Sequence, residues 1–479
     1  MTDDQARPGR VGTWRELFSA EHRAPVVVLA GGVGLFATNT YVTTSLMPSA
    51  VADIRGEELY AWTMTVFVVT AVISSMLVAR TLDRFGGRSA YLGGFLVFAA
   101  GTAVAAAAPT MGVMLIGRAV QGLAAGLLAG LGFAVVRLIL PAFLWQRAVA
   151  LMSAMWGVGN LLGPVIGGVF AQLGVWRGAF VLLAVIALAL GGLAARVLPR
   201  AAGTSRTDDD PVPWLALVLL AVSALLISVA SLETDATAVA ALMLAAVVCA
   251  AGFVLRERRA SVRVLPAMIY RGSSPLRWIY LSILLLTLAV TIETFVPLFG
   301  QRLGAMSPLA AGFFGAAISW GWTVGSISSS TLESERAKRV VRVLGPTLIS
   351  LGFLAYGLLQ TDAPSGWVIA GWVGSLFVAG TGIGMAMAHW LTSGLKAAST
   401  PGTGEAAQIS AGMNTTQLIA TAFGSALAGL LVALGGPSLL GSARVLSFGY
   451  VLIGVLAVVV AFREFGSARR YREPVADQP

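Results

Sequence analysis

The chain has 479 residues, of which 57% are hydrophobic and only 11% are charged. A soluble domain carries about a quarter charged residues and cannot hide so much apolar surface in one core, so the composition excludes a soluble protein and indicates an all-α polytopic membrane protein. The formal net charge of +10 does not indicate nucleic-acid binding, because the arginines lie mostly in loops between hydrophobic segments.

Hydrophobic stretches of about 20 residues, the length that crosses a bilayer, recur along the whole chain. Residues 1–23 are polar and lack the apolar core and cleavage site of a signal peptide, so the first stretch is expected to be a retained membrane helix. Fourteen spans are predicted, at 24–48, 60–80, 89–108, 111–138, 147–172, 178–198, 212–231, 236–255, 278–300, 307–330, 342–360, 366–391, 405–434 and 443–462.

The basic residues between these spans predict the orientation of the chain. With a cytoplasmic N-terminus, the inner loops and the tail hold Arg80, Arg84, Arg88, Arg137, Arg147, Arg196, Arg200, Arg206, Arg256, Arg258, Arg259, Arg263, Arg336, Lys338, Arg339, Arg469, Arg470 and Arg472. The outer loops and their margins hold Arg55, Arg177, Arg302 and Arg444, one each. This asymmetry is the positive-inside pattern, and it predicts a bacterial inner-membrane protein with both termini in the cytoplasm.

The spacing of the spans predicts five parts. A cytoplasmic segment (1–23) precedes an N-terminal six-helix bundle (24–200), a linker with two additional membrane helices (201–263), a C-terminal six-helix bundle (264–465) and a cytoplasmic tail (466–479). The two additional spans, 212–255, contain almost no polar group at membrane depth. They are therefore expected to pack and face lipid rather than to carry chemistry.

Four polar or glycine-rich patterns interrupt the first five spans and their loops. In chain order they are NTYVTTSLMP (39–48), ARTLDRFGGR (79–88), RAVQG (118–122) and GNLLGPVIGG (159–168). The last pattern spaces small residues four or five apart around a proline, which favours a close helix crossing and a bend.

Together these patterns resemble the major facilitator superfamily, specifically its fourteen-span drug–proton antiporters, and the resemblance covers the whole chain. The arginine-rich, lysine-poor composition is similar to that of actinobacterial members, including mycobacterial pumps linked to fluoroquinolone export. The resemblance implies a fold of two six-helix bundles plus two inserted helices. It also implies an exporter, because the pattern in span five accompanies exporters in the superfamily: Gly159, Gly163, Pro164, Gly167 and Gly168.

The resemblance further implies a conformational latch after span two. In the superfamily an acid and arginines of this inner loop latch the two bundles, which gives that role to Asp83, Arg84 and Arg88. The expected partner is the start of the span at 405–434, near Gly404 and Glu405, where free helix N–H groups attract an acid. The sequence departs from the family pattern at Ala79 and Gly87, and an ordinary basic loop is the alternative.

Proton coupling requires an ionisable group inside the membrane. Arg118 lies roughly 12 Å from the outer end of its span and is implicated in coupling in the family, with snorkelling to the interface as the alternative. Related proteins commonly carry an aspartate where this chain has Asn39. The acid found deep in a span is Glu293, roughly 24 Å along its helix from Arg277. An interfacial glutamate wetted from outside is the alternative.

Further residues are candidates for a substrate cavity. Aromatic and methionine side chains accept varied shapes, and amides can face a cavity or bond neighbouring helices, although ordinary packing is equally compatible with each. His389 is either a proton stop or an interfacial residue. The cavity candidates are Asn39, Tyr41, Met155, Trp156, Asn160, Phe295, Trp320, His389, Asn414 and Gln417.

Three functional classes compete. The first is a proton-coupled exporter of amphipathic molecules, acting as a monomer among membrane lipids. The second is a dedicated exporter of an endogenous metabolite, lipid, siderophore or antibiotic, and the third is a non-transporting receptor or membrane enzyme. The sequence contains no nucleotide-binding loop and no His-Glu-x-x-His pair, and a single cysteine, Cys249, forms neither an internal disulfide nor a cysteine metal cluster. No metal, cofactor or enzymatic activity is therefore expected, and an ion gradient rather than ATP supplies the energy.

Overall fold

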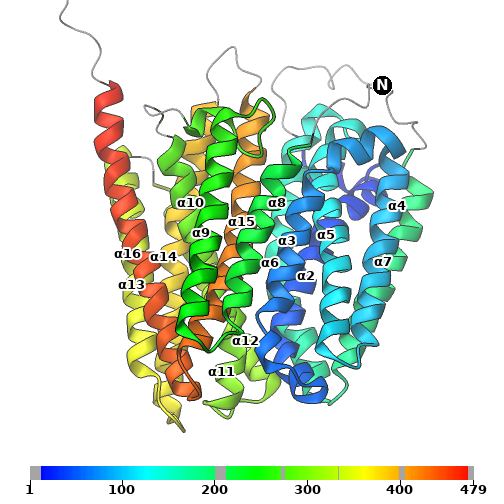
Figure 1. Ribbon diagram of the computed structural model, residues 1–479. Helices are drawn as coiled ribbons and strands as arrows, with labels where there is room; N and C mark the ends of the chain where they lie inside the picture. Colours follow the sequence, from blue (N-terminus) through cyan, green and yellow to red (C-terminus); the bar gives the residue numbers. More distant parts are fainter. Residues whose placement is uncertain are drawn as a thin grey trace, which may run out of the picture. The chain divides into compact units, whose positions relative to one another are not determined.

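The computed structural model describes residues 12–199, 212–270, 274, 276–332, 334–398 and 405–472. The chain divides into two compact units, one made of Met1–Leu46 and Thr70–Pro211 and the other of Met47–Val69 and Val212–Pro479. Within the described ranges every regular element is a helix (Figure 1). The all-helical membrane architecture predicted from composition is confirmed.

Two helices contribute to both units, and the others belong to one. The shared helices are α2 (Arg23–Ile54) and α3 (Trp62–Ser75). The first unit also contains α1 (Trp14–Leu17), α4 (Val78–Ala106), α5 (Met111–Ile139), η3 (Ala142–Leu144), α6 (Trp145–Gln172) and α7 (Trp176–Val197). The second contains η2 (Glu57–Leu59), α8 (Trp214–Ala230), α9 (Ala236–Arg259), η4 (Ala267–Tyr270), α10 (Leu276–Val290), η5 (Thr291–Thr294), α11 (Val296–Arg302), α12 (Pro308–Ser329), α13 (Glu335–Leu359), α14 (Gly366–Ala398), α15 (Glu405–Leu434) and α16 (Leu439–Arg472).

Twelve helices in the described ranges are long and apolar enough to cross a membrane. All fourteen predicted spans are helical, but two fall outside that set. α8 has only 17 residues, and α12, with 22 residues, is diluted by glycine and serine. The count of fourteen spans therefore stays a prediction for these two.

Two sequence-based boundaries need correction. Residues 83–88 were expected to form a tight loop, but α4 already begins at Val78 and is kinked at Gly86, whose φ of 72° lies in the left-handed region that glycine adopts without strain. The span predicted at 278–300 was expected to be continuous. It is broken into α10, η5 and α11, and Glu293 lies in the break.

Small residues set the close packing of the first unit. A methyl group at Gly117 of α5 would lie 2.7 Å from the backbone nitrogen of Ala105 in α4, and one at Gly101 of α4 would lie 2.7 Å from that of Gln121. Backbones approach this closely only where side chains are absent. α4 and α5 are therefore in direct contact along the turns that carry Arg118 and Gln121.

The segment before the first span is also ordered in the first unit, which the sequence did not predict. Thr13 and Glu16 form a capping box at the start of α1, and Leu17 is fully buried. The Gly12 N–H donates to the Phe143 carbonyl (2.8 Å), and Arg147 Nε donates to the Gly12 carbonyl (3.1 Å). These contacts hold residues 12–17 against the connection between α5 and α6.

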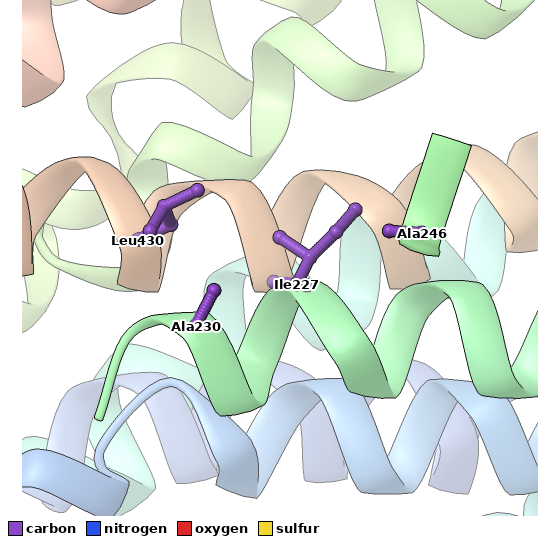
Figure 2. Close-up of a cluster of buried hydrophobic side chains, with 5 residues drawn as sticks. Ile227, Ala230, Ala246 and Leu430 are labelled. Atoms are coloured by element: carbon purple, nitrogen blue, oxygen red, sulfur yellow. The ribbon is translucent and has the colours of Figure 1, made fainter. Parts of the chain in front are cut away.

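In the second unit, the additional helices pack on the C-terminal bundle. α8 contacts α9 and α15, and the three helices lie side by side in Figure 1. Figure 2 shows Ile227 and Ala230 of α8 facing Leu430 of α15, with Ala246 of α9 beside them. Ala426 completes this buried cluster. Most residues of α9 are exposed, which agrees with the expectation that this helix faces lipid.

Candidate functional site

Glu293 is the ionisable group at the centre of the second unit's candidate site. It lies in η5, is half-buried, and accepts a hydrogen bond from the Ser319 hydroxyl of α12 at 3.4 Å. This carboxylate is partly removed from water, and the hydrogen bond from the neutral Ser319 hydroxyl is long and therefore weak. It is a suitable group to bind and release a proton.

Pro297 explains the break in this helix. In a continuous helix the N–H of residue 297 would donate to the carbonyl of Glu293, four residues earlier. Proline has no N–H and its ring clashes with that carbonyl, so the helix cannot run through. Pro297 instead occupies the first turn of α11, where the missing donor costs nothing. The sequence thus places a helix break at its embedded acid.

Hydrogen bonds between hydroxyl groups stabilise the start of η5, at Thr291. Thr291 Oγ1 and the Tyr450 hydroxyl of α16 are 2.7 Å apart. The Tyr450 hydroxyl donates to the Gly424 carbonyl of α15 at 3.1 Å. η5 is therefore held between α12, α15 and α16, three helices that share one unit.

An aromatic pair and an ion pair lie next to the break, also within the second unit. The ring of Phe295 lies 4.9 Å from that of Tyr60 and 6.2 Å from that of Phe299, and Phe295 is almost fully buried. Arg302 at the end of α11 forms an ion pair with Glu57 of η2, with Nη1 donating to Oε2 at 3.2 Å. Phe295, a cavity candidate, thus contacts other aromatic rings. Tyr60 and Glu57 were not predicted from the sequence.

In the first unit, the structure brings together the predicted residues Arg118 and Asn39, Gln121 of the RAVQG pattern, and a fourth residue that was not singled out. Arg118 is fully buried, and its Nη1 donates to Gln121 Oε1 at 2.9 Å. Gln121 Nε2 donates to Thr102 Oγ1 (2.8 Å) and to Asn39 Oδ1 (3.4 Å). Thr102 is the unpredicted member. Snorkelling does not describe Arg118, because its side chain is enclosed by protein.

The glycine-rich run of α6 lies against α2. Methyl groups at Gly159 and Gly167 would come within 2.7 Å of the Ala37 backbone carbon and 2.6 Å of the Val42 carbonyl oxygen. Gly163 faces Tyr41 in the same way, and Pro164 and Gly168 are buried inside the helix. The close helix crossing expected from the spacing is present. Its role in export stays a prediction.

The remaining cavity candidates in the first unit lie near the same crossing. Trp156 packs edge-on against Phe36, with ring centroids 5.2 Å apart, and is 41% exposed. Met155 lies against Gly34 of α2. Asn160 is buried, and its Oδ1 has no hydrogen-bond partner among the residues that the structure describes.

The predicted latch residues lie on the first turns of α4. Asp83 and Arg88 are half-buried, and Arg84 is exposed, with its guanidinium 5.5 Å from the Phe85 ring centroid. Of their expected partners, Gly404 and the Glu405 side chain lie outside the described residues. The latch remains a proposal.

The inner part of the second unit contains a buried ion pair that sequence reasoning missed. Arg342 of α13 lies 3.5 Å from Glu464 of α16, and both are less than 10% exposed. Arg342 also donates to Ser393 and lies over the Trp390 ring of α14, 4.7 Å from its centroid. Arg342 begins one predicted span and Glu464 lies two residues beyond the end of another, so hydropathy does not mark either charge as buried. Glu293 is therefore not the only buried acid.

His389 and the other candidates in the second unit are separate from the break. His389 Nε2 lies 3.1 Å from the Ser329 carbonyl at the end of α12, and the ring is 7% exposed. Trp320 packs near Phe313 and is 37% exposed, Asn414 is exposed and Gln417 is half-buried. Among the described residues, no group of three or more His, Cys, Asp or Glu side chains could hold a metal ion.

Long apolar helices with polar and charged side chains buried between them define a polytopic membrane protein. Residues 29–425 match the Major Facilitator Superfamily, and the chain belongs to that family. This confirms the resemblance found in the sequence motifs.

Relatives cover nearly the whole chain. It is 42% identical over 467 residues to a probable multidrug-efflux transporter of Mycobacterium tuberculosis, covering 96% of this chain and 98% of the relative. It is 23% identical to a tetracenomycin C resistance and export protein of Streptomyces glaucescens, covering 85% and 75%. A solved POT family transporter in complex with 5-aminolevulinic acid has the same fold, with a TM-score of 0.64, 17% identity and coverage of 95% and 98%.

Proposed function

We propose that this protein is a proton-coupled antiporter that exports amphipathic small molecules, including drugs, across the bacterial inner membrane. The similarity to probable multidrug-efflux transporters over almost the full chain supports the cargo class. The observation that carries the proposal is the position of Glu293, a half-buried carboxylate in a helix break opposite Ser319. A helix break next to an ionisable group permits local movement that changes the group's access to water.

Each unit contributes its own polar element in this proposal. In the second unit, Glu293 takes up a proton from outside and releases it to the cytoplasm. In the first, the buried guanidinium of Arg118 donates to the neutral amide of Gln121, which in turn bonds Asn39, and it provides the positive field that responds to substrate and proton. Asp83, Arg84, Arg88 and Glu405 form the latch, and the small residues of α6 set the helix crossing.

Orientation and environment follow from the loop charges. We infer that both termini are cytoplasmic, that the transporter acts as a monomer, and that its inner loops contact anionic lipid headgroups. The predicted substrate contacts are Asn39, Tyr41, Met155, Trp156, Asn160, Phe295, Trp320, His389, Asn414 and Gln417. Each of these residues is part of the proposal.

The proposal is tested with purified protein in proteoliposomes, using ethidium as a monocationic amphiphilic probe. An imposed pH gradient of the exporting sign should drive ethidium accumulation in vesicles that contain the protein, and a protonophore should abolish it. Protein-free vesicles are the control for passive partitioning. Accumulation that ignores the pH gradient would remove proton coupling from the account.

A dedicated exporter is the second candidate, and the similarity to an export protein named for a single antibiotic favours it. The scaffold would be identical and only the substrate contacts would differ. Drug-resistance profiles in a pump-deficient host, compared with the metabolites retained by a deletion strain, separate the two. One retained metabolite with an unchanged drug profile would favour the dedicated exporter.

A further inference from the structure

Glu257 is a fully buried carboxylate at the end of α9, between exposed arginines. Its Oε1 and Oε2 accept hydrogen bonds from the Val264 N–H (3.1 and 3.0 Å), and Oε2 also accepts one from the Leu265 N–H (3.1 Å). The Tyr270 hydroxyl donates to Oε2 at 3.4 Å. One side chain thus satisfies the backbone donors of the turn that follows α9.

Nearby groups reinforce this turn. Arg263 Nε donates to the backbone carbonyl of Glu257 at 2.8 Å. Burial and the neighbouring Glu257 raise the pKa of the Tyr270 hydroxyl, so Tyr270 stays a neutral donor. The connector Ala260–Tyr270 is therefore a fixed element attached to α9 rather than a loose linker.

The fixed connector contacts the beginning of α15. A methyl group at Gly412 would lie 2.6 Å from Pro266 Cδ and 2.8 Å from the Tyr280 hydroxyl oxygen, so no side chain fits between them. Tyr280 belongs to α10, and its hydroxyl donates to the Ile409 carbonyl at 2.7 Å, so α10 holds the same part of α15 beside the connector. Ile409 is fully buried in the first turns of the helix.

The additional helices contact the same helix a second time, near its other end. Ile227 and Ala230 of α8 pack on Leu430 of α15 in the cluster of Figure 2. α15 is therefore contacted at both ends by one continuous piece of chain, from α8 through α9 to η4. Two helices that only faced lipid would not require a buried carboxylate, Glu257, in the last turn of α9.

We propose that α8, α9 and the connector Ala260–Tyr270 form a brace that positions α15, and that Glu257 is the positioning residue that fastens the brace to the start of that helix. This gives the additional helices a mechanical role. It deepens the proposed transport function, because the start of α15 is where the latch partner Glu405 is expected, and that part of the inference rests on the proposed function.

The brace is tested by thiol labelling, which does not depend on transport. In a Cys249→Ser background, Ile409→Cys places a thiol at the braced end of α15, and Ala386→Cys places one at an equally buried position of α14. Adding Glu257→Gln leaves N–H donors unsatisfied, so we expect maleimide labelling at position 409 in detergent to become about tenfold faster while position 386 is unchanged. Glu233→Gln, at an exposed acid between α8 and α9, is the matched control and should change neither rate.

Two labelling outcomes would overturn the brace. The first is an unchanged rate at position 409, and the second is a parallel rise at both positions, which is the mark of general unfolding. Transport is measured separately in the same variant. There we expect a lower maximal rate at an unchanged half-saturating concentration, because α15 is mispositioned while substrate contacts are intact. If the proton-exporter proposal failed, the labelling result would still stand.

Discussion

At the scale of single residues, proline and glycine determine where this protein departs from regular helix. Pro297 frees the carbonyl of Glu293, and Gly86 supplies the left-handed backbone of the α4 kink. Both residues are visible in the sequence. The partner of Glu293 is not visible there, because Ser319 lies on another helix and becomes a neighbour only when the helices pack. Gln121, the partner of Arg118, lies three residues away on the same helix.

Gly159 makes a residue-scale prediction about packing. Gly159→Ala should destabilise the protein by about 1–3 kcal/mol, because its new methyl group would meet the Ala37 backbone of α2. Gly157 lies two residues earlier on another face of α6, where an added methyl group would have no atom within 4 Å. Gly157→Ala should therefore stabilise the helix by up to about 1 kcal/mol. Thermal unfolding in detergent measures both. Equal shifts in the two variants would contradict a close crossing at Gly159.

Asp83 makes a second prediction at this scale. Asp83→Asn keeps the size of the side chain and removes the charge that the proposed latch requires. Export should fall severely while the amount of folded protein in the membrane stays near that of the wild type. Resistance assays together with immunoblots of membrane fractions measure the two quantities. A fully active Asp83→Asn variant would remove the latch from the proposed function.

At the scale of helices, the sequence predicts the presence of each helix better than where the helix starts or breaks. Apolar length located a helix at every predicted span, because a membrane imposes that length. It did not predict the break at Glu293, the early start of α4 or the docking of residues 12–17 against Phe143 and Arg147. These features depend on local hydrogen bonds and long-range packing, which hydropathy does not encode. Arg342 and Glu464 were missed for the same reason, since each lies at a span end and pairs with a helix distant in sequence.

The additional helices make an element-scale prediction. Leu215 of α8 is 56% exposed, so it faces lipid and not the proposed substrate contacts. Leu215→Phe and Leu215→Ala should leave the range of exported compounds unchanged, as the brace acts through the opposite face of α8. Export profiling with a panel of substrates measures this. A redirected specificity would place α8 in the transport path.

At the scale of the whole molecule, the charge inventory limits the cargo. Among the described residues few acids are buried in the spans: Glu293 stands beside the neutral Ser319 hydroxyl, Glu464 is already paired with Arg342, and Glu257 already accepts hydrogen bonds from backbone N–H groups. Little fixed negative charge is therefore left to hold a dication. Monocationic, zwitterionic and neutral amphiphiles should be exported better than divalent antiseptics, as minimum inhibitory concentrations for matched compound pairs would show. Strong resistance to dications with weak resistance to monocations would contradict this inventory.

The exchange of protons for drug at Glu293 is the central claim, and one substitution tests it most directly. Glu293→Gln keeps the shape of the side chain and its contact with Ser319 but removes the exchangeable proton. In proteoliposomes, a pulse of drug should release protons from the wild type and none from Glu293→Gln, while the variant still binds neutral ligands. If Glu293→Gln instead released protons and concentrated drug against a gradient with normal pH dependence, Glu293 would be structural, and the coupling group would have to be sought at Asp83 or His389.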